Sequence, residues 1–486
     1  MSARRIGYVD VTLRDGHQSL WATRMSNAMI MPFVARMDEM GFDWINLEGG
    51  AVFDVCVRFL HEDPWERMRL VASRVDKTPV DIMTRGQSLF TFRFYADDVV
   101  ELAIRRIAAN GMSRVTIYDA LNDTRNLALS ARTAKSEGLY VCAGLVYTVS
   151  PVHTDGYYQD VARGLLALGV DSILIKDPAG LLVPDRVKTL VPALKAIVGN
   201  VPLELHSHSL SGMAEPCYLE AAPLGVDVLH TASHPLASGA SLPQNEYCVR
   251  HLQQEGLVSD VSLGDLAEME EYFTEVADRH GFPVAVPHRY DPDLYRHQVP
   301  GGMISNLRND LARMGMQDRL EQILEEAAQV RVDLGYPILV SPFAQFIVTQ
   351  AMLNVLQGRR YKTMPTEVLL YLLGGYGRLP GQPLPELMDR AIEELGQDPV
   401  DARPGERIPP ALPALRRERG PFESDDDLVL AACYTDLELA PLFAARPWAP
   451  VPSAGSPVAR LLSELAAGDL REATISGHGL RLSLRR

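Results

Sequence analysis

The sequence predicts an α/β fold, a closed (β/α)8 TIM barrel followed by a mostly helical C-terminal domain, and three observations support it. Short β-type runs alternate eight times with amphipathic helical patterns in the first half of the chain. Most of these runs are continuously apolar, as parallel strands are when both faces of their sheet are covered. The segment after the first strand, Arg14-Asp15-Gly16-His17-Gln18, lacks the Gly-rich loop typical of an open dinucleotide-binding sheet. Eight strand–helix units therefore favour the closed barrel.

The expected strands cover residues 6–13, 44–48, 80–84, 114–118, 140–147, 172–175, 203–208 and 226–231. Helical periodicity between them predicts helices at residues 28–40, 98–109, 124–136, 157–168, 184–197 and 213–222. In such a barrel the chemistry sits at the carboxyl ends of the strands. The polar side chains expected there are those of Asp15, Gln18, Glu48, Arg85, Asp119, Tyr147, Lys176, Asp177, His206, His208 and His230.

The pattern becomes mostly helical beyond about residue 295, with long helical stretches expected at 303–314, 317–334 and 342–356. Residues 397–422 are rich in Pro and Arg, and 447–457 resemble a linker. Weak alternation within 472–486 predicts a short strand pair. The chain is accordingly divided into a barrel domain (1–295), a helical domain (296–446) and a linker with a short terminal segment (447–486).

Composition excludes several classes of protein. A formal net charge of −15 argues against a nucleic-acid-binding surface, which would be basic. Five scattered cysteines without a CxxC pair fit a reducing compartment better than a disulfide framework. The N-terminus has no apolar signal region, and no stretch is apolar enough to span a membrane. We expect a cytoplasmic protein that is not integral to a membrane.

Lys176 is the most informative single residue. The chain has six lysines among 47 Lys and Arg residues, yet a lysine ends the apolar run 172–175. A lysine can lose its proton when desolvated and its amine can then react, for instance with CO2 to give an anionic carbamate. A lone lysine at a strand end more often extends to solvent, and alternate residues such as His206 and His208 share a strand face in any case.

Together these residues indicate a metal centre. A divalent metal accepts imidazole nitrogen and carboxylate-like oxygen, which His206, His208 and a carbamylated Lys176 would supply. One Asp would complete the set, and the spacing leaves Asp15, Asp119 and Asp177 open.

The same motifs resemble a known family. Residues 10–25, which read DVTLRDGHQSLWATRM, are similar to the LRDAHQSLxATR signature of biotin-dependent carboxyltransferases. This family includes pyruvate carboxylase, the oxaloacetate decarboxylase α subunit and the carboxyltransferase subunit of transcarboxylase. The resemblance continues through residues 49–51, 62–67, 85–87, 147–154, 175–182, 206–208 and 299–306.

The resemblance implies a fold, a site and a chemistry. The fold is the barrel followed by a funnel-like helical domain, usually in a homodimer. The family's metal (Zn, Co or Mn) is held at positions that correspond to Asp15, carbamylated Lys176, His206 and His208. The keto acid is bound at positions that correspond to Gln18, Arg85 and Arg14. Ser341 takes the place of a catalytic threonine that moves a proton between biotin and pyruvate, although it could also be an ordinary helix cap before Pro342.

Several positions depart from the family pattern. They are Glu48, Ser88, Phe92, Pro178, Leu210 and His230, of which Glu48 and His230 would add titratable groups near the pocket. The chain also contains no Met-Lys-Met biotin-attachment motif, and its last lysine is Lys362. Biotin is therefore expected on a separate carrier protein.

Three functions follow in order of preference. The first is a metal-dependent carboxyltransferase or decarboxylase that acts on a pyruvate- or oxaloacetate-like keto acid through an enolate, with carboxybiotin on a carrier protein. The second is a biotin-independent metal-dependent lyase or decarboxylase that acts on a related acid. The third is a non-catalytic assembly or regulatory subunit.

Overall fold

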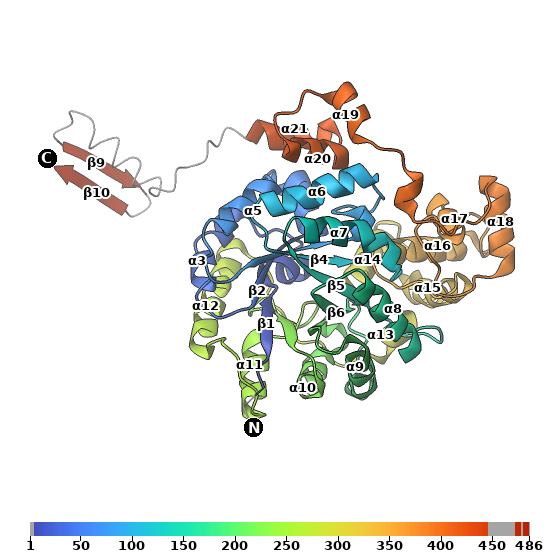
Figure 1. The fold of residues 1–486 in the computed structure, drawn as a ribbon, viewed down its shortest axis with the longest axis horizontal. Helices are drawn as coiled ribbons and strands as arrows, with labels where there is room; N and C mark the ends of the chain where they lie inside the picture. The colour runs from blue at the N-terminus through green and yellow to red at the C-terminus, as the bar shows by residue number, and fades with distance from the viewer. Residues whose placement is uncertain (1–3, 446–471, 478–479, 486) are drawn as a thin grey trace.

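A computed structural model describes residues 4–445, 472–477 and 480–485. Eight strands form a closed barrel in chain order, and every neighbouring pair is parallel (Figure 1). They are β1 (Gly7–Asp10), β2 (Trp44–Gly49), β3 (Val80–Thr84), β4 (Arg114–Tyr118), β5 (Tyr140–Val146), β6 (Ser172–Asp177), β7 (Leu203–Ser207) and β8 (Val228–Thr231). The predicted (β/α)8 barrel is confirmed.

Helices surround the barrel and bury its outer face (Figure 1). The first part of the chain supplies α1 (His17–Leu20), α2 (Asn27–Ile30), α3 (Val34–Met37), α4 (Gly50–Val55) and α5 (Pro64–Ala72). The next part supplies α6 (Asp97–Ala109), α7 (Ala128–Ser136), α8 (Asp155–Ala167), α9 (Pro184–Val198), α10 (Ala214–Leu224), α11 (Asn245–Gln254) and α12 (Leu263–His280). The single helix expected at 28–40 is divided into α2 and α3, because Pro32 between them has no N–H to donate.

The first strand ends earlier than predicted, at Asp10 rather than residue 13. The Asp10 carboxylate accepts hydrogen bonds from the backbone N–H of Thr12 at 3.1 Å and from its hydroxyl at 2.9 Å. These bonds turn the chain into a short helical segment, Thr12–Gly16. The turn matters for the site, because Asp15 belongs to this helical segment and lines the cavity at the mouth of the barrel.

The chain after residue 291 is mostly helical, as predicted. Helices α13 (Pro292–His297), α14 (Gly301–Arg313), α15 (Leu320–Asp333), α16 (Phe343–Gln357), α17 (Thr366–Leu372) and α18 (Pro385–Leu395) belong to this part, and most of them pack around a second apolar core. Helices α19 (Leu412–Arg419), α20 (Asp425–Cys433) and α21 (Asp436–Ala445) return to the barrel, where α20 packs on α6 (Figure 1). The strands β9 (Glu472–Gly477) and β10 (Leu480–Arg485) form the expected antiparallel pair. The domain limits at residues 295 and 446 stay a prediction.

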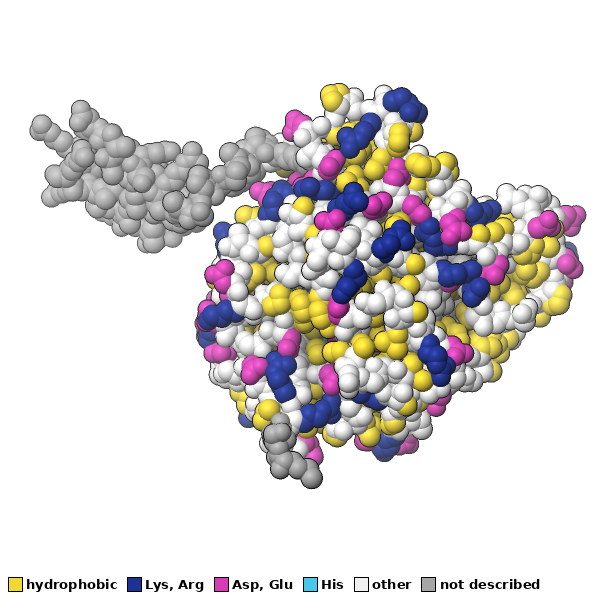
Figure 2. All heavy atoms as spheres, viewed as in Figure 1, with side chains coloured by type: hydrophobic (Ala, Val, Ile, Leu, Met, Phe, Trp, Pro, Cys, Tyr) yellow, Lys and Arg dark blue, Asp and Glu magenta, His cyan; other side chains and the backbone are white. Residues whose placement is uncertain are grey.

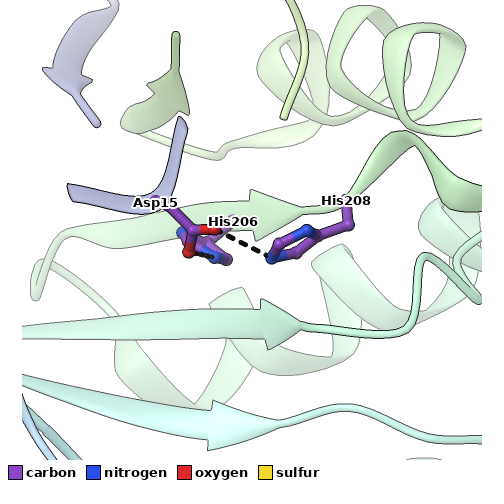
Figure 3. Close-up of side chains that lie close together, drawn as sticks. All are labelled: Asp15, His206 and His208. Atoms are coloured by element: carbon purple, nitrogen blue, oxygen red, sulfur yellow. Dashed lines mark ion pairs between the residues drawn. The ribbon is translucent and has the colours of Figure 1, made fainter. Parts of the chain in front are cut away.

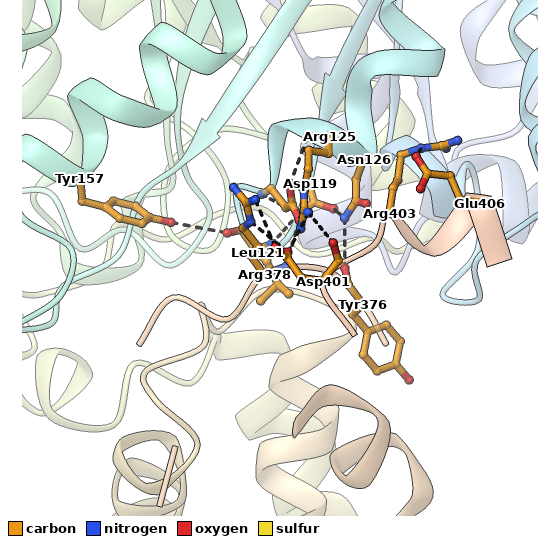
Figure 4. Close-up of polar contacts among 11 residues, drawn as sticks. Asp119, Leu121, Arg125, Asn126, Tyr157, Tyr376, Arg378, Asp401, Arg403 and Glu406 are labelled. Atoms are coloured by element: carbon orange, nitrogen blue, oxygen red, sulfur yellow. Dashed lines mark hydrogen bonds and ion pairs between the residues drawn. The ribbon is translucent and has the colours of Figure 1, made fainter. Parts of the chain in front are cut away.

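Polar contacts join the barrel to the helical part. Arg331 of α15 is buried and donates hydrogen bonds to the carbonyl of Val149 and the hydroxyl of Thr148, which follow β5. A second set of contacts lies at the loop after β4, where Asn126 donates to the carbonyl of Tyr376 and Arg125 pairs with Asp401 (Figure 4). The helical part is therefore fixed against the carboxyl ends of the barrel strands.

Charges of both signs are interspersed over the face of the molecule shown in Figure 2. In the part of the chain that the structure describes, no helix is both long enough and apolar enough to cross a membrane.

Candidate metal centre and substrate cavity

A cavity of about 320 Å³ lies between the barrel mouth and the helical part. The strand ends and their loops contribute Arg14, Asp15, Gln18, Met83, Arg85, Tyr118, Lys176 and His208, among others. The helical part contributes Pro300, Met303, Leu339, Val340, Ser341, Ala344 and Gln345. The cavity lies where the chemistry of a parallel barrel is expected.

Asp15, His206 and His208 lie close together (Figure 3), and Asp15 and His208 line this cavity. Their potential ligand atoms all lie within 4.8 Å of one another, and all three residues are buried. Nε2 of His206 is 3.3 Å from one Asp15 carboxylate oxygen, and Nε2 of His208 is 3.6 Å from the other. Although burial opposes ionisation of Asp15, the Arg14 guanidinium and His208 hold its pKa well below its ordinary value. An anionic oxygen and two imidazole nitrogens form a donor set that suits a divalent metal.

The other two candidate aspartates have structural roles. Asp119 accepts hydrogen bonds from the backbone N–H groups of Leu121 and Asp123, so it stabilises the turn after β4. Asp177 does the same for the N–H groups of Leu181 and Leu182 in the loop after β6. Spacing along the sequence could not separate the three aspartates, whereas the fold brings Asp15 alone of the three to the two histidines.

Lys176 lies beside this set. Its Nζ is 3.2 Å from Nε2 of His206, and the residue is only 4% exposed, so it does not extend to bulk solvent. Burial, reinforced by the nearby guanidinium groups of Arg14 and Arg85, lowers the pKa of Lys176 to about 7. A large neutral fraction at physiological pH is the state in which a lysine amine reacts with electrophiles.

Arg14 holds Asp15 in place. One guanidinium nitrogen lies 2.6 Å from the carboxylate of Asp15, and Nε donates to the side-chain oxygen of Asn46 at 2.6 Å. The remaining terminal nitrogen, Nη2, is buried without a hydrogen-bond partner among the described residues. Arg14 therefore supports the carboxylate, and its side chain also lines the cavity.

Arg85 presents a guanidinium to the cavity. Its Nε donates to the hydroxyl of Tyr118 at 3.1 Å, and one terminal nitrogen donates to the carbonyl of Thr91. The guanidinium also stacks on Phe92, whose ring centroid lies 4.8 Å away. No carboxylate of the described residues is within ion-pair distance of Arg85, so its charge is available to an anion in the cavity.

Gln18 and Ser341 complete the predicted site. Gln18 is half-buried on α1 and lines the cavity on the barrel side. Ser341 lines it on the helical side, where its hydroxyl accepts a hydrogen bond from the side chain of Gln345 at 3.1 Å. The cap position of α16 is Pro342, so Ser341 lies one residue before it rather than at the helix cap.

Glu48 does not reach the cavity, so the expectation that it would place a carboxylate near the pocket is wrong. Its side chain is fully buried at the end of β2 and lies 3.7 Å from Arg67. Burial raises the pKa of Glu48 to about 8. His230 is also fully buried, behind His206 rather than at the cavity surface.

Glu204 and Arg114 are two polar residues of the barrel interior that sequence reasoning missed. Arg114 donates to Glu204 at 2.7 Å, and Glu204 contacts Nε2 of His230 at 2.9 Å. A usable signal was present, because both are charged residues within strands that are otherwise largely apolar.

The chain is similar in sequence and in fold to known carboxylases and carboxyltransferases. Residues 294–442 match a family described as a conserved carboxylase domain. The chain is 40% identical to a pyruvate carboxylase subunit of Methanocaldococcus jannaschii over 433 residues, which covers 88% of this chain and 76% of that protein. It is 33% identical to the methylmalonyl-CoA carboxyltransferase 5S subunit of Propionibacterium freudenreichii subsp. shermanii, covering 90% of this chain and 87% of that one. The carboxyl transferase domain of Rhizobium etli pyruvate carboxylase, solved with 3-bromopyruvate, superimposes with a TM-score of 0.85 at 27% identity, covering 92% of this chain and 78% of that one.

Proposed function

The chain belongs to the carboxyltransferase family of pyruvate carboxylase and transcarboxylase, and from this premise we propose the reaction that its cavity supports. It is an enzyme that transfers a carboxyl group to or from a keto acid. The proposed substrate is a pyruvate- or oxaloacetate-like acid, and the proposed donor or acceptor is biotin on a separate carrier protein. One observation carries the proposal: Lys176, Asp15 and His208 line the same cavity as Arg85, which has no carboxylate partner among the described residues. His206 lies beside Asp15 and Lys176.

Asp15, His206 and His208 would hold a divalent metal, together with Lys176 after carbamylation. In that modification the neutral amine forms an N–C bond to CO2 and one proton is released. When bound, such a metal supplies Lewis-acid chemistry, which lowers the free energy of negative charge that develops on a keto oxygen. The proposed metal is Zn, Co or Mn, as the family resemblance implies.

The cavity residues would orient the keto acid. Arg85 pairs with its carboxylate, Gln18 binds it from α1, and Arg14 lines the same cavity. Removal of a methyl proton then gives an enolate whose developing charge these donors stabilise.

Ser341 would relay the proton. Its hydroxyl accepts a proton from the methyl group of the keto acid and passes its own to the ring nitrogen of biotin as the N–carboxylate bond breaks. The CO2 released is attacked by the enolate carbon, and a new C–C bond forms. The reverse reaction decarboxylates oxaloacetate. In both directions one CO2 moves between biotin and the keto acid, and one proton moves the opposite way.

The remaining parts of the proposal concern partners and location. A biotin carrier and a homodimer are both proposed from the family resemblance. A cytoplasmic location fits the five cysteines, all of which are free and buried.

The proposal is tested by following oxaloacetate decarboxylation in metal-replete protein with and without free biotin. Biotin should raise the rate of pyruvate formation in a saturable manner, since the carboxyl group then has an acceptor. A rate that does not respond to biotin would instead favour the metal-dependent lyase. Stoichiometric metal with no turnover of either kind would refute oxaloacetate as the substrate.

Replacement of Arg85 by Gln should weaken keto-acid binding. Loss of a charge-assisted bond to a carboxylate costs about 1.5–3 kcal/mol, which corresponds to about a 10- to 100-fold fall in kcat/KM. Steady-state kinetics over a range of oxaloacetate concentrations would measure this fall.

A matched control is Arg24→Gln, because Arg24 also stacks on an aromatic ring, that of Phe59 at 4.3 Å, but does not line the cavity. Equal effects of the two substitutions would show that Arg85 has no special role in binding the acid.

A further inference from the structure

Gly50, the first residue of α4, is buried and lines the same cavity as Arg85. A Cβ atom added at Gly50 would lie 2.8 Å from Cζ of Arg85 and 3.1 Å from its Nη2, and it would lie closer still to Nη1. Non-bonded carbon atoms are in favourable contact at about 3.5–4.0 Å, so these distances are too short for both groups to keep their places. The Arg85 guanidinium therefore occupies the space that a side chain at position 50 would need.

The backbone does not itself require glycine at this position. Gly50 has no positive φ angle, and Gly49 before it is extended, with φ −171° and ψ 172°. Alanine also forms helices more readily than glycine does. The contact with Arg85 thus accounts for the absence of a side chain at position 50.

The Arg85 guanidinium is held on its other sides by the loop after β3 and by β4. Its Nε donates to the hydroxyl of Tyr118 at 3.1 Å, and its Nη1 donates to the carbonyl oxygen of Thr91 at 3.1 Å. Nη1 is the atom closest to the added Cβ, so movement away from position 50 disturbs this bond first. Nη2 donates to no group of the described residues, which leaves this nitrogen for an anion in the cavity.

Helix α4 cannot easily move away from Arg85, because aromatic side chains fix it to the same loop. Phe53 of α4 stacks on Phe90, with ring centroids 3.8 Å apart. Trp65 packs edge-on against both rings. All three side chains are 1% exposed or less, so a shift of the helix would open an apolar core.

The loop that carries Arg85 is fixed as well. The side chain of Gln87 donates to the carbonyl oxygen of Tyr95 at 2.7 Å and to Asp97 at 2.9 Å. Arg403, from the chain beyond the helical core, donates to the side-chain oxygen of Gln87 at 3.0 Å. With helix and loop both held, the group that yields to a side chain at position 50 is the flexible end of Arg85.

We propose that Gly50 is a positioning residue, whose lack of a side chain gives the Arg85 guanidinium the place from which it meets the carboxylate of the keto acid. The inference rests on the proposed function for the role of Arg85, whereas the place of the guanidinium is a property of the protein alone. Gly50→Ala should lower kcat/KM for oxaloacetate about 10- to 100-fold, as loss of a charge-assisted bond does. The change should lie mainly in KM, because the residues of the metal set and Ser341 are untouched.

A first test reads the position of Arg85 directly. Crystal structures of the wild-type protein and of Gly50→Ala, both without substrate, should show the guanidinium displaced and its bond to the carbonyl of Thr91 broken. The backbone of α4 should superimpose in the two structures. An unmoved guanidinium beside a shifted α4 would overturn the proposal, whatever the enzyme acts on.

A second test measures KM for oxaloacetate in a double-variant cycle. Because Gly50 acts through Arg85, adding Gly50→Ala to Arg85→Gln should change KM no further, whereas effects that add would overturn the proposal. Gly264→Ala is a matched control near the start of α12, where the residue is exposed and an added Cβ would have its nearest neighbour at 3.7 Å. This variant should keep the wild-type KM.

The double variant also decides the matter if Gly50→Ala alone does not fold. Folding that is restored by Arg85→Gln would identify the guanidinium as the obstacle and support the proposal. Failure of both to fold would show that the backbone requires glycine, and the proposal would be wrong. A displaced guanidinium in a protein without turnover of oxaloacetate would support the positioning of Arg85 and refute only the proposed reaction.

Discussion

Replacement of Lys176 by Arg is expected to lower the rate of carboxyl transfer by about a thousand-fold or more. The amine of Lys176 lies 3.2 Å from His206 in a buried site, and a guanidinium there keeps its proton and cannot form a carbamate. The substitution thus exchanges a proposed anionic ligand for a permanent cation beside Asp15 and the two imidazoles. Loss of about 4 kcal/mol of Lewis-acid stabilisation corresponds to a fall of this size.

The experiment measures kcat/KM with oxaloacetate and the metal content of the purified protein. Lys195→Arg is a matched control, because Lys195 pairs with Asp227 at 3.1 Å on the outer side of the barrel and should change neither quantity. Isotopically labelled CO2 should also give a carbamate signal that Lys176→Arg abolishes. Full metal content and near-normal turnover in Lys176→Arg would refute the carbamate ligand.

Replacement of Ser341 by Ala should stop transfer between biotin and the keto acid while leaving keto-acid binding intact. The hydroxyl lines the cavity opposite the metal set, and a methyl group cannot relay a proton. Loss of a general acid–base group lowers turnover about a hundredfold to ten-thousand-fold. Because Arg85 and Gln18 remain, KM for the keto acid should change little.

Conservative and distant variants make this result specific. Ser341→Thr keeps the hydroxyl and should retain most of the activity. Ser136→Ala removes a hydroxyl that bonds to the carbonyl of Thr133 on an outer helix, and it should behave as the wild type does. Biotin-dependent turnover in Ser341→Ala that stays within about threefold of the wild type would exclude a proton relay, since such a role is worth far more.

The barrel could be predicted because its signals are local. Each strand is a short apolar run. Eight such runs, separated by helical patterns, are enough to predict a closed parallel barrel. The predicted first strand is too long because the three residues after Asp10 are also apolar or β-branched. What ends it is a bond from Thr12 to the Asp10 carboxylate, and strand propensity contains no information about such a bond.

The metal set could be predicted only in part. Lys176 lies near the end of β6, and His206 and His208 lie at and just after the end of β7. The two strands are neighbours in any such barrel, so the proximity of these residues follows from topology. The choice of Asp15 over Asp119 and Asp177 depends on which carboxylates are used by turns, and this appears only in three dimensions. Position at a strand end predicts that Glu48 faces the pocket, although its side chain is buried against Arg67 instead.

The buried contacts of Glu204 with Arg114 and His230 also affect which substitutions this sequence can accept during evolution. Removal of the acid at position 204 alone takes from Arg114 a carboxylate that pairs with its charge. It also removes the acceptor that faces Nε2 of His230. Both groups are buried, so water cannot replace the lost partner. Removal of the imidazole at position 230 alone takes away the group that faces Nδ1 of His206 at 3.3 Å. Single substitutions are therefore penalised, while a paired exchange that restores one donor and one acceptor is tolerated. Substitutions at positions 204 and 230 are therefore expected to occur together, although the two positions are 26 residues apart along the chain.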